Sequence, residues 1–135
     1  MNEYISVPAI LVSALVMFFL GFMAHGPIGG QLWMRLAGIK MPENPPKFSG
    51  MIGQMVANYA MNVQSTFVMC GFYISMGALG MAQALWIAGL VWLVSVSATS
   101  MEPIWMGRKM PHFLFEVVSS FINLMAAGAV IAWMV

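Results

Sequence analysis

Charged residues are scarce in this chain of 135 residues. Asp, Glu, Lys and Arg together make up 7% of the sequence, whereas the hydrophobic residue types make up 61%. A soluble domain carries roughly a quarter of its residues as charges, so this composition excludes an ordinary soluble globular domain. The five basic residues form no dense cluster, so nucleic acid is not expected as a partner.

Cysteine and the common catalytic motifs are also nearly absent. Cys70 is the single cysteine, so no intrachain disulfide can form. The chain has neither a Gly-x-Ser-x-Gly nucleophile elbow nor a glycine-rich phosphate loop. The sequence therefore predicts a protein that is not an enzyme and that holds no cofactor.

Long hydrophobic runs are what the chain has in abundance. Four of them, at residues 5–25, 50–73, 81–99 and 113–135, are close to the roughly 20 helical residues that cross the hydrocarbon core of a bilayer. They lack the polar alternation of barrel strands, and helices are the other way to satisfy the backbone in lipid. The sequence predicts an all-α protein with one integral membrane domain over residues 1–135, folded as a four-helix transmembrane bundle.

All five basic residues fall in two of the three connections between these spans. The first connection contains Arg35, Lys40 and Lys47, and the third contains Arg108 and Lys109. By the positive-inside rule both connections face the cytoplasm, which places both termini and the uncharged middle connection on the periplasmic side.

The segment at residues 28–39 predicts a short amphipathic helix between spans one and two. Leu32, Leu36 and Ile39 share one helical face, and Trp33 is suited to anchor the segment at headgroup depth. The alternative is a frayed extension of the first span.

The two halves of the chain resemble each other weakly. The elements Pro27-Ile28 and Trp33-Met34-Arg35 in the first half are echoed by Pro103-Ile104-Trp105-Met106 in the second, and further counting places Asn58 opposite Asn123. One interpretation is two repeated helical hairpins related by an axis along the membrane normal. The alternative is that Pro, Trp and Met simply collect where membrane helices end.

Polar side chains recur at helical spacing within two of the predicted spans. The second and fourth spans each carry three on one face, which predicts an intramembrane cluster. Interhelical hydrogen bonding that fixes the packing is the favoured interpretation, and a path for a solute or ion is the alternative. The cluster comprises Gln54, Asn58, Asn62, Glu116, Ser120 and Asn123.

Glu116 is the most demanding member, because a carboxylate inside a membrane must find a cation, become protonated or reach water. A second cluster is expected beside it at the cytoplasmic helix ends, formed by His25, Glu102, Arg108 and His112. A structural ion pair is favoured, and a proton-handling pair is the alternative. The two histidines with Glu102 and Glu116 could also form a mixed metal site, but their spacing is not diagnostic, so we predict no bound metal.

Short motifs along nearly the whole chain resemble one bacterial membrane family. Gly21, His25-Gly26-Pro27 and Trp33-Met34-Arg35 are similar to the Gly…Tyr-Ser-Pro…Trp-Met-Arg pattern of the family called domain of unknown function 1761. Trp105-Met106-Gly107-Arg108 resembles its Trp-Glu-Gly-Arg. His25 stands where the family pattern has an aromatic hydroxyl, and Glu116 stands where it usually has Asn. The resemblance implies a small four-span membrane protein and supplies no activity.

Three kinds of function remain open for a small protein of the bacterial inner membrane. We favour a non-catalytic structural or accessory subunit that packs with itself or with a larger membrane complex, because little of the chain lies outside the bilayer to build a binding site. The second is a small oligomeric channel or transporter that uses the Asn/Gln/Glu path. The third is a membrane redox or metal enzyme.

Overall fold

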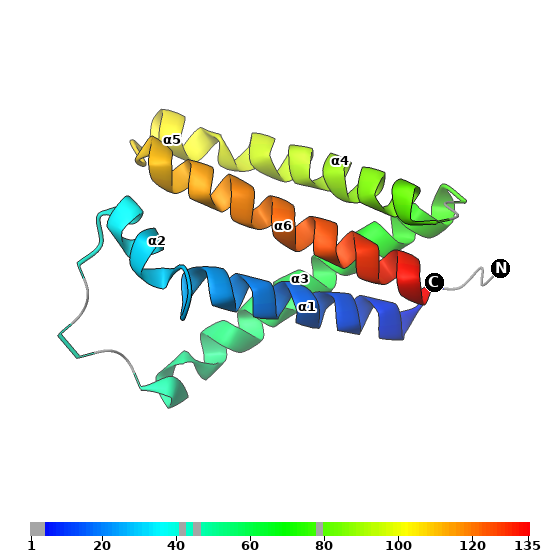
Figure 1. Cartoon of the computed structure of the whole chain (residues 1–135), viewed down its shortest axis with the longest axis horizontal. Coiled ribbons are helices and arrows are strands. Elements are labelled where there is room, and N and C mark those ends of the chain that lie inside the picture. The colour runs from blue at the N-terminus through cyan, green and yellow to red at the C-terminus, as the bar shows by residue number, and fades with distance from the viewer. Residues whose placement is uncertain (1–4, 41–42, 45–46, 78–79) are drawn as a thin grey trace.

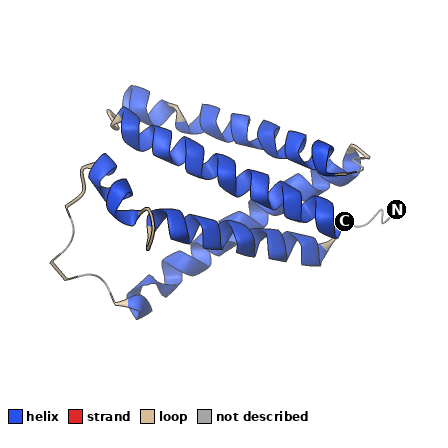
Figure 2. Ribbon diagram, in the orientation of Figure 1, coloured by secondary structure: helices blue, strands red, loops and turns tan. Residues whose placement is uncertain are grey.

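The computed structural model describes residues 5–40, 43–44, 47–77 and 80–135, and within these residues the chain is all-α, with helices and no strands. Figure 1 labels the helices along the chain, and Figure 2 shows that short turns and loops connect most of them. The helices are α1 Val7–His25, α2 Gly30–Ala37, α3 Phe48–Ser75, α4 Met81–Thr99, α5 Met101–Trp105 and α6 Met110–Met134.

The central helix of the fold is α6. It packs against α1 on one side and α4 on the other, and the three lie side by side in one layer (Figure 1). Helix α3 crosses behind this layer at an angle and makes its main contacts with α1. Its buried residues are all in its second half, from Thr66 to Tyr73, and its first half extends away from the layer.

Small residues allow the helices to approach each other closely. A Cβ atom added to Gly128 on α6 would lie 3.0 Å from both the Ala84 carbonyl oxygen and the Ala88 Cβ on α4. Ala127 and Ala88 are fully buried at the same contact. Close backbone approach through Gly and Ala is how helices gain van der Waals contact when lipid surrounds them.

Hydrogen bonds from side chains to backbone join the same helices. Thr66 on α3 donates to the Ile10 carbonyl oxygen on α1 at 3.1 Å, and the indole of Trp92 on α4 donates to the Val117 carbonyl oxygen on α6 at 3.0 Å. Both donors are turned inward, as expected where the surroundings offer few other partners. These bonds connect α3 to α1 and α4 to α6.

Three helical segments among the described residues are long and apolar enough to cross a membrane: Val7–His25, Met81–Trp105 and Met110–Met134. They correspond to predicted spans one, three and four. The segment Met81–Trp105, which corresponds to span three, continues through α5, a helix that was not predicted from the sequence. Helix α3 occupies predicted span two with 28 residues but does not reach the same apolarity, since amide side chains lie along it.

Both short helices lie at the same end of the molecule, with the C-terminal end of α1 and the N-terminal end of α6 (Figure 1). Helix α2 is shorter than the predicted 28–39, because Gly38 adopts a left-handed conformation with φ of 74° and ends it. The two basic connections meet at this end, and the turn from α3 to α4 lies at the other.

Candidate functional site

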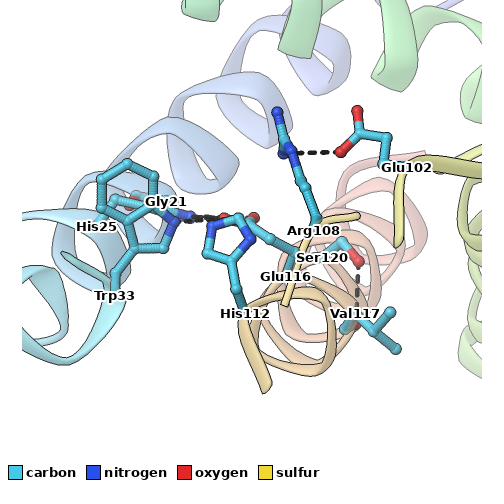
Figure 3. A network of polar contacts seen from close by, with 9 residues as sticks. All are labelled: Gly21, His25, Trp33, Glu102, Arg108, His112, Glu116, Val117 and Ser120. Carbon is cyan, nitrogen blue, oxygen red and sulfur yellow. Dashed lines mark hydrogen bonds and ion pairs between the residues drawn. The ribbon is translucent and has the colours of Figure 1, made fainter. Parts of the chain in front are cut away.

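Glu116 on α6 is the centre of a polar cluster at the end that carries the short helices (Figure 3). Its Oε1 accepts a hydrogen bond of 2.6 Å from the indole N–H of Trp33 on α2. His25, the last residue of α1, places its Nε2 3.1 Å from both carboxylate oxygens. Helices α1 and α2 therefore meet α6, which is distant from them in sequence, at one carboxylate.

A glycine-rich turn brings Trp33 to this position. The Ile28 and Gly29 amides both donate to the Met23 carbonyl oxygen, at 3.2 and 3.1 Å, so the chain reverses directly after α1. A Cβ atom on Gly29 would lie 2.0 Å from the Ala24 carbonyl oxygen, a distance that no side chain tolerates. The absence of a side chain at this residue allows α2 to fold back over the end of α6.

The hydrogen bonds of His25 determine how many protons its side chain shares with the Glu116 carboxylate. Its Nδ1 lies 3.0 Å from the Gly21 carbonyl oxygen, which can only accept, so Nδ1 carries a hydrogen. The contact between Nε2 and Glu116 then needs one more proton, located either on the imidazole or on the carboxyl group. The pair His25–Glu116 is therefore electrically neutral as long as it holds this single proton.

His112 faces the same carboxylate from one turn earlier on α6. Its Nε2 is 3.6 Å from Glu116 Oε1, which is beyond hydrogen-bonding distance, and the atom has no hydrogen-bond partner among the described residues. The side chain is only 8% exposed. A buried polar nitrogen without a partner is uncommon in folded proteins and marks a place where a further group can bind.

One cavity lies between α4 and α6, beside Glu116. Its volume is about 350 Å³, and Arg108 and Glu102 lie on its wall with a distance of 2.7 Å between Nη1 and Oε2. The other lining residues are Ser95, Val96, Thr99, His112, Phe113, Glu116, Val117 and Ser120.

A second cavity, of about 570 Å³, lies between α1 and the first half of α3. Amide side chains from α3 and α6 line it, together with aromatic and methionine side chains and with His25. Asn62 Nδ2 donates to Asn58 Oδ1 at 3.1 Å within this wall. The amide residues are Gln54, Asn58, Asn62 and Asn123.

The structure therefore divides the predicted groups differently from the sequence reading. The four amides of the predicted intramembrane cluster line one cavity, whereas Glu116 and Ser120 line the other. The predicted cytoplasmic-end cluster also separates, since Arg108 pairs with Glu102 and His25 pairs with Glu116. Glu116 joins the two arrangements, because it lines the first cavity and bonds a residue that lines the second.

Sequence reasoning missed one contributor to the site and one hydrogen bond that supports the fold. Trp33 was assigned to the headgroup region, but its N–H bonds Glu116 within the protein. Thr66 continues the four-residue spacing of Gln54, Asn58 and Asn62, and extending that stripe by one step would have identified the bond to α1.

The described part of the chain contains no group of three or more His, Cys, Asp or Glu side chains arranged to hold a metal ion. Glu102, one member of the metal alternative, is occupied by Arg108. The geometry thus supports proton sharing and hydrogen bonding as the chemistry of the cluster.

Comparison with protein families agrees with the motifs around this cluster. The model of a family described as a protein of unknown function (DUF1761) matches residues 8–132. The chain belongs to this family. None of the curated proteins and none of the solved structures gives a significant match to this DUF1761 member.

Two positions that the sequence resemblance singled out are bonded to each other. His25 and Glu116 are expected from that resemblance to differ from the family pattern, and their side chains are 3.1 Å apart although 91 positions separate them. A hydroxyl and an amide at these positions would form a neutral hydrogen bond, whereas His and Glu form a pair that binds a proton.

Proposed function

We propose that this chain is a small four-span protein of the bacterial inner membrane with a non-catalytic role, in which it packs with further copies of itself or with a larger membrane complex. The support comes from α3, whose polar first half is not packed against neighbouring helices as the other long helices are. The family match agrees with a small membrane protein and leaves the role open.

The direction of the chain supports α3 as the fourth span. Helix α1 ends beside α2, and α4 begins at the opposite end of the molecule (Figure 1). If α1, α4 and α6 cross the bilayer, the segment between α1 and α4 must cross it in return. Helix α3 has 28 residues, and at 1.5 Å per residue it is about 42 Å long, which is sufficient.

The positions of the basic residues support the proposed orientation. Both basic connections lie at one end, with α2 and α5, which we assign to the cytoplasmic side by the positive-inside rule. The turn from α3 to α4 and the C-terminal end of α6 are then periplasmic. A cysteine at Arg108, in a chain whose Cys70 is replaced by Ala, would react with an impermeant maleimide only after the inner membrane is opened.

The similar order of elements in the two halves supports a repeated hairpin. Each half consists of a long helix, a short helix and a second long helix. The halves are packed differently, however, since α6 is enclosed between α1 and α4 while the first half of α3 is open. We interpret the first half of α3 as the surface that lacks a packing helix, such as the helices that enclose α6.

The observation that carries the assembly proposal is the exposure of amide side chains on α3. Gln54 and Asn58 are both exposed in the isolated chain, in a helix long enough to cross the bilayer. Lipid offers an amide no hydrogen bond, so such groups face protein or water. A helix from another copy or from a different membrane protein, packed on this face, would satisfy them.

Gln54→Leu tests this proposal against Met61→Leu as a control. Met61 is an exposed apolar residue on the same helix that does not line the cavity. We expect wild-type and Met61→Leu protein to migrate as one assembly in mild detergent and in nanodiscs, and Gln54→Leu to shift toward the monomer, as read by native mass spectrometry. A wild-type chain that is monomeric and partnerless in both media would contradict the proposal.

A transporter is the second candidate, and the observation that favours it is the meeting of two cavities at Glu116. One of its neighbours, His25, lines the cavity opposite to the one that Glu116 itself lines. Protein in proteoliposomes would then exchange a solute or protons. Unchanged rates after Glu116→Gln and after Asn58→Leu would exclude this path.

A further inference from the structure

The cavity between α4 and α6 offers hydrogen-bond acceptors to a bound molecule. Three hydroxyl groups line it, and each already donates its hydrogen to a helix carbonyl oxygen: Ser95 to Val91 at 2.8 Å, Thr99 to Ser95 at 3.0 Å and Ser120 to Val117 at 3.0 Å. A hydroxyl has one hydrogen, so these oxygens present lone pairs to the cavity.

Two carboxylates add further acceptors to this wall. Glu116 and Glu102 both line the cavity, and so does His112, whose buried Nε2 has no hydrogen-bond partner in the described structure. Carboxylate oxygens accept hydrogen bonds. The lining thus matches a ligand that is rich in N–H donors.

The charges in the cavity match a ligand with a single positive charge. Arg108 neutralises Glu102 through their 2.7 Å contact, and the proton shared by Glu116 and His25 makes that pair neutral. When this proton leaves, one uncompensated negative charge remains on Glu116. A monovalent cation restores neutrality, so cation and proton compete for the same site.

Apolar side chains complete the cavity. Val96, Phe113 and Val117 stand beside the polar groups, and the volume of about 350 Å³ falls at the lower end of the range typical of small-molecule sites. These side chains suit an alkyl group attached to the charged head, which a simple metal cation does not have.

We propose that the cavity between α4 and α6 binds a small alkylammonium ion, which displaces the proton shared by Glu116 and His25. The ammonium group donates to the Glu116 carboxylate and to the hydroxyl oxygens, and the alkyl chain packs against Phe113 and the valines. One proton is released to water for each ammonium ion bound. This site does not depend on the assembly role, since none of the residues that line it belongs to α3.

The titratable and charged groups around the site come from three helices and one connection. His25 ends α1, Glu102 belongs to α5, Arg108 lies in the connection before α6, and His112 and Glu116 are on α6. Helix α2 contributes only the uncharged donor Trp33, since Arg35 lines a different cavity. Proton release on binding is therefore assigned to the Glu116–His25 pair.

Calorimetric titration of the purified full chain with n-butylammonium tests the proposal. We expect saturable binding of one ion per chain, with release of one proton, read from the dependence of the heat on the ionisation enthalpy of the buffer. Tetramethylammonium has the same charge and no N–H donors, and we expect it to bind at least tenfold more weakly. Equal binding of tetramethylammonium or of sodium, or binding without proton release, would overturn the proposal.

Glu116→Gln removes the charge, and Glu43→Gln makes the same change at an exposed residue that does not line the cavity. We expect at least a tenfold loss of n-butylammonium affinity for Glu116→Gln and no change for Glu43→Gln. Thr99 is exposed, so Thr99→Val removes one hydrogen-bond acceptor without disturbing a buried contact. We expect a threefold or larger loss of n-butylammonium affinity. Wild-type affinity in both Glu116→Gln and Thr99→Val would overturn the assignment to this cavity.

Discussion

The indole N–H of Trp33 donates a 2.6 Å hydrogen bond to Glu116 Oε1, and this contact fastens α2 to α6. The same carboxylate is bonded by His25 at the end of α1. Because α2 has only eight residues, it is too short to be stable by itself, and its position depends on such contacts. A single carboxylate thus organises the end of the molecule where the two basic connections meet.

Trp33→Phe should destabilise the protein by about 1.5 to 3 kcal/mol, because the aromatic ring remains but a hydrogen bond to a charged group is lost. Reversible unfolding in detergent, followed by circular dichroism, measures the change. Trp105→Phe is the control, since Trp105 is 78% exposed at the end of α5. Equal effects of the two changes would show that the bond to Glu116 contributes nothing.

His25→Tyr and Glu116→Asn should each lower stability, and the double variant should recover most of the loss. Each single change leaves a partner that the new side chain cannot match in charge, whereas Tyr with Asn restores a neutral hydrogen bond. We expect a coupling free energy of about 0.5 to 3 kcal/mol in the double-mutant cycle. Additive effects would contradict a direct interaction between the two positions.

Gly29→Ala and Gly53→Ala should act in opposite directions. A Cβ atom on Gly29 meets the Ala24 carbonyl oxygen at 2.0 Å, so the turn must open and α2 must leave Glu116. Gly53 lies within α3 with nothing within 4 Å of its Cβ position, and Ala there should stabilise the helix by about 0.5 to 1 kcal/mol. Thermal unfolding of both variants, followed by circular dichroism, distinguishes the outcomes.

Gly128→Ala should separate α4 from α6. The added methyl group would lie 3.0 Å from the Ala84 carbonyl oxygen, a backbone atom that cannot turn away, and overpacking of this kind costs about 1 to 3 kcal/mol. Gly89→Ala is the matched control, because its Cβ would meet only the flexible end of Met125 at 3.5 Å. If Gly128→Ala is as stable as Gly89→Ala, α4 and α6 can move apart without a cost in stability.

Local features of the chain were sufficient to predict most of the helices. The apolar runs predicted 81–99 with the bounds that α4 has, and 5–25 and 113–135 within a few residues of α1 and α6. Helix formation depends on neighbours three and four positions apart, so these signals are contained in each segment. The family was also identified from its short motifs, and the match to residues 8–132 confirms it.

Burial and pairing of the polar residues, in contrast, were decided by the tertiary structure. The spacing of Gln54, Asn58 and Asn62 showed that they share a helical face. It did not show that this face lines a cavity to which Glu116 does not contribute. Likewise, Arg108 and His25 were equally plausible partners for Glu116 from their depth alone. Only the antiparallel packing of α1 on α6 brought His25 to the carboxylate.

The sequence by itself thus determined that the chain is helical, apolar and a member of its family, because these properties depend on composition and short-range periodicity. The tertiary structure decided which polar groups meet. A hydrogen bond between residues 91 positions apart depends on how three helices pack, and no local pattern contains that distance. The proton shared by His25 and Glu116 is a property of the packed molecule, because it exists only when two side chains distant in sequence come into contact.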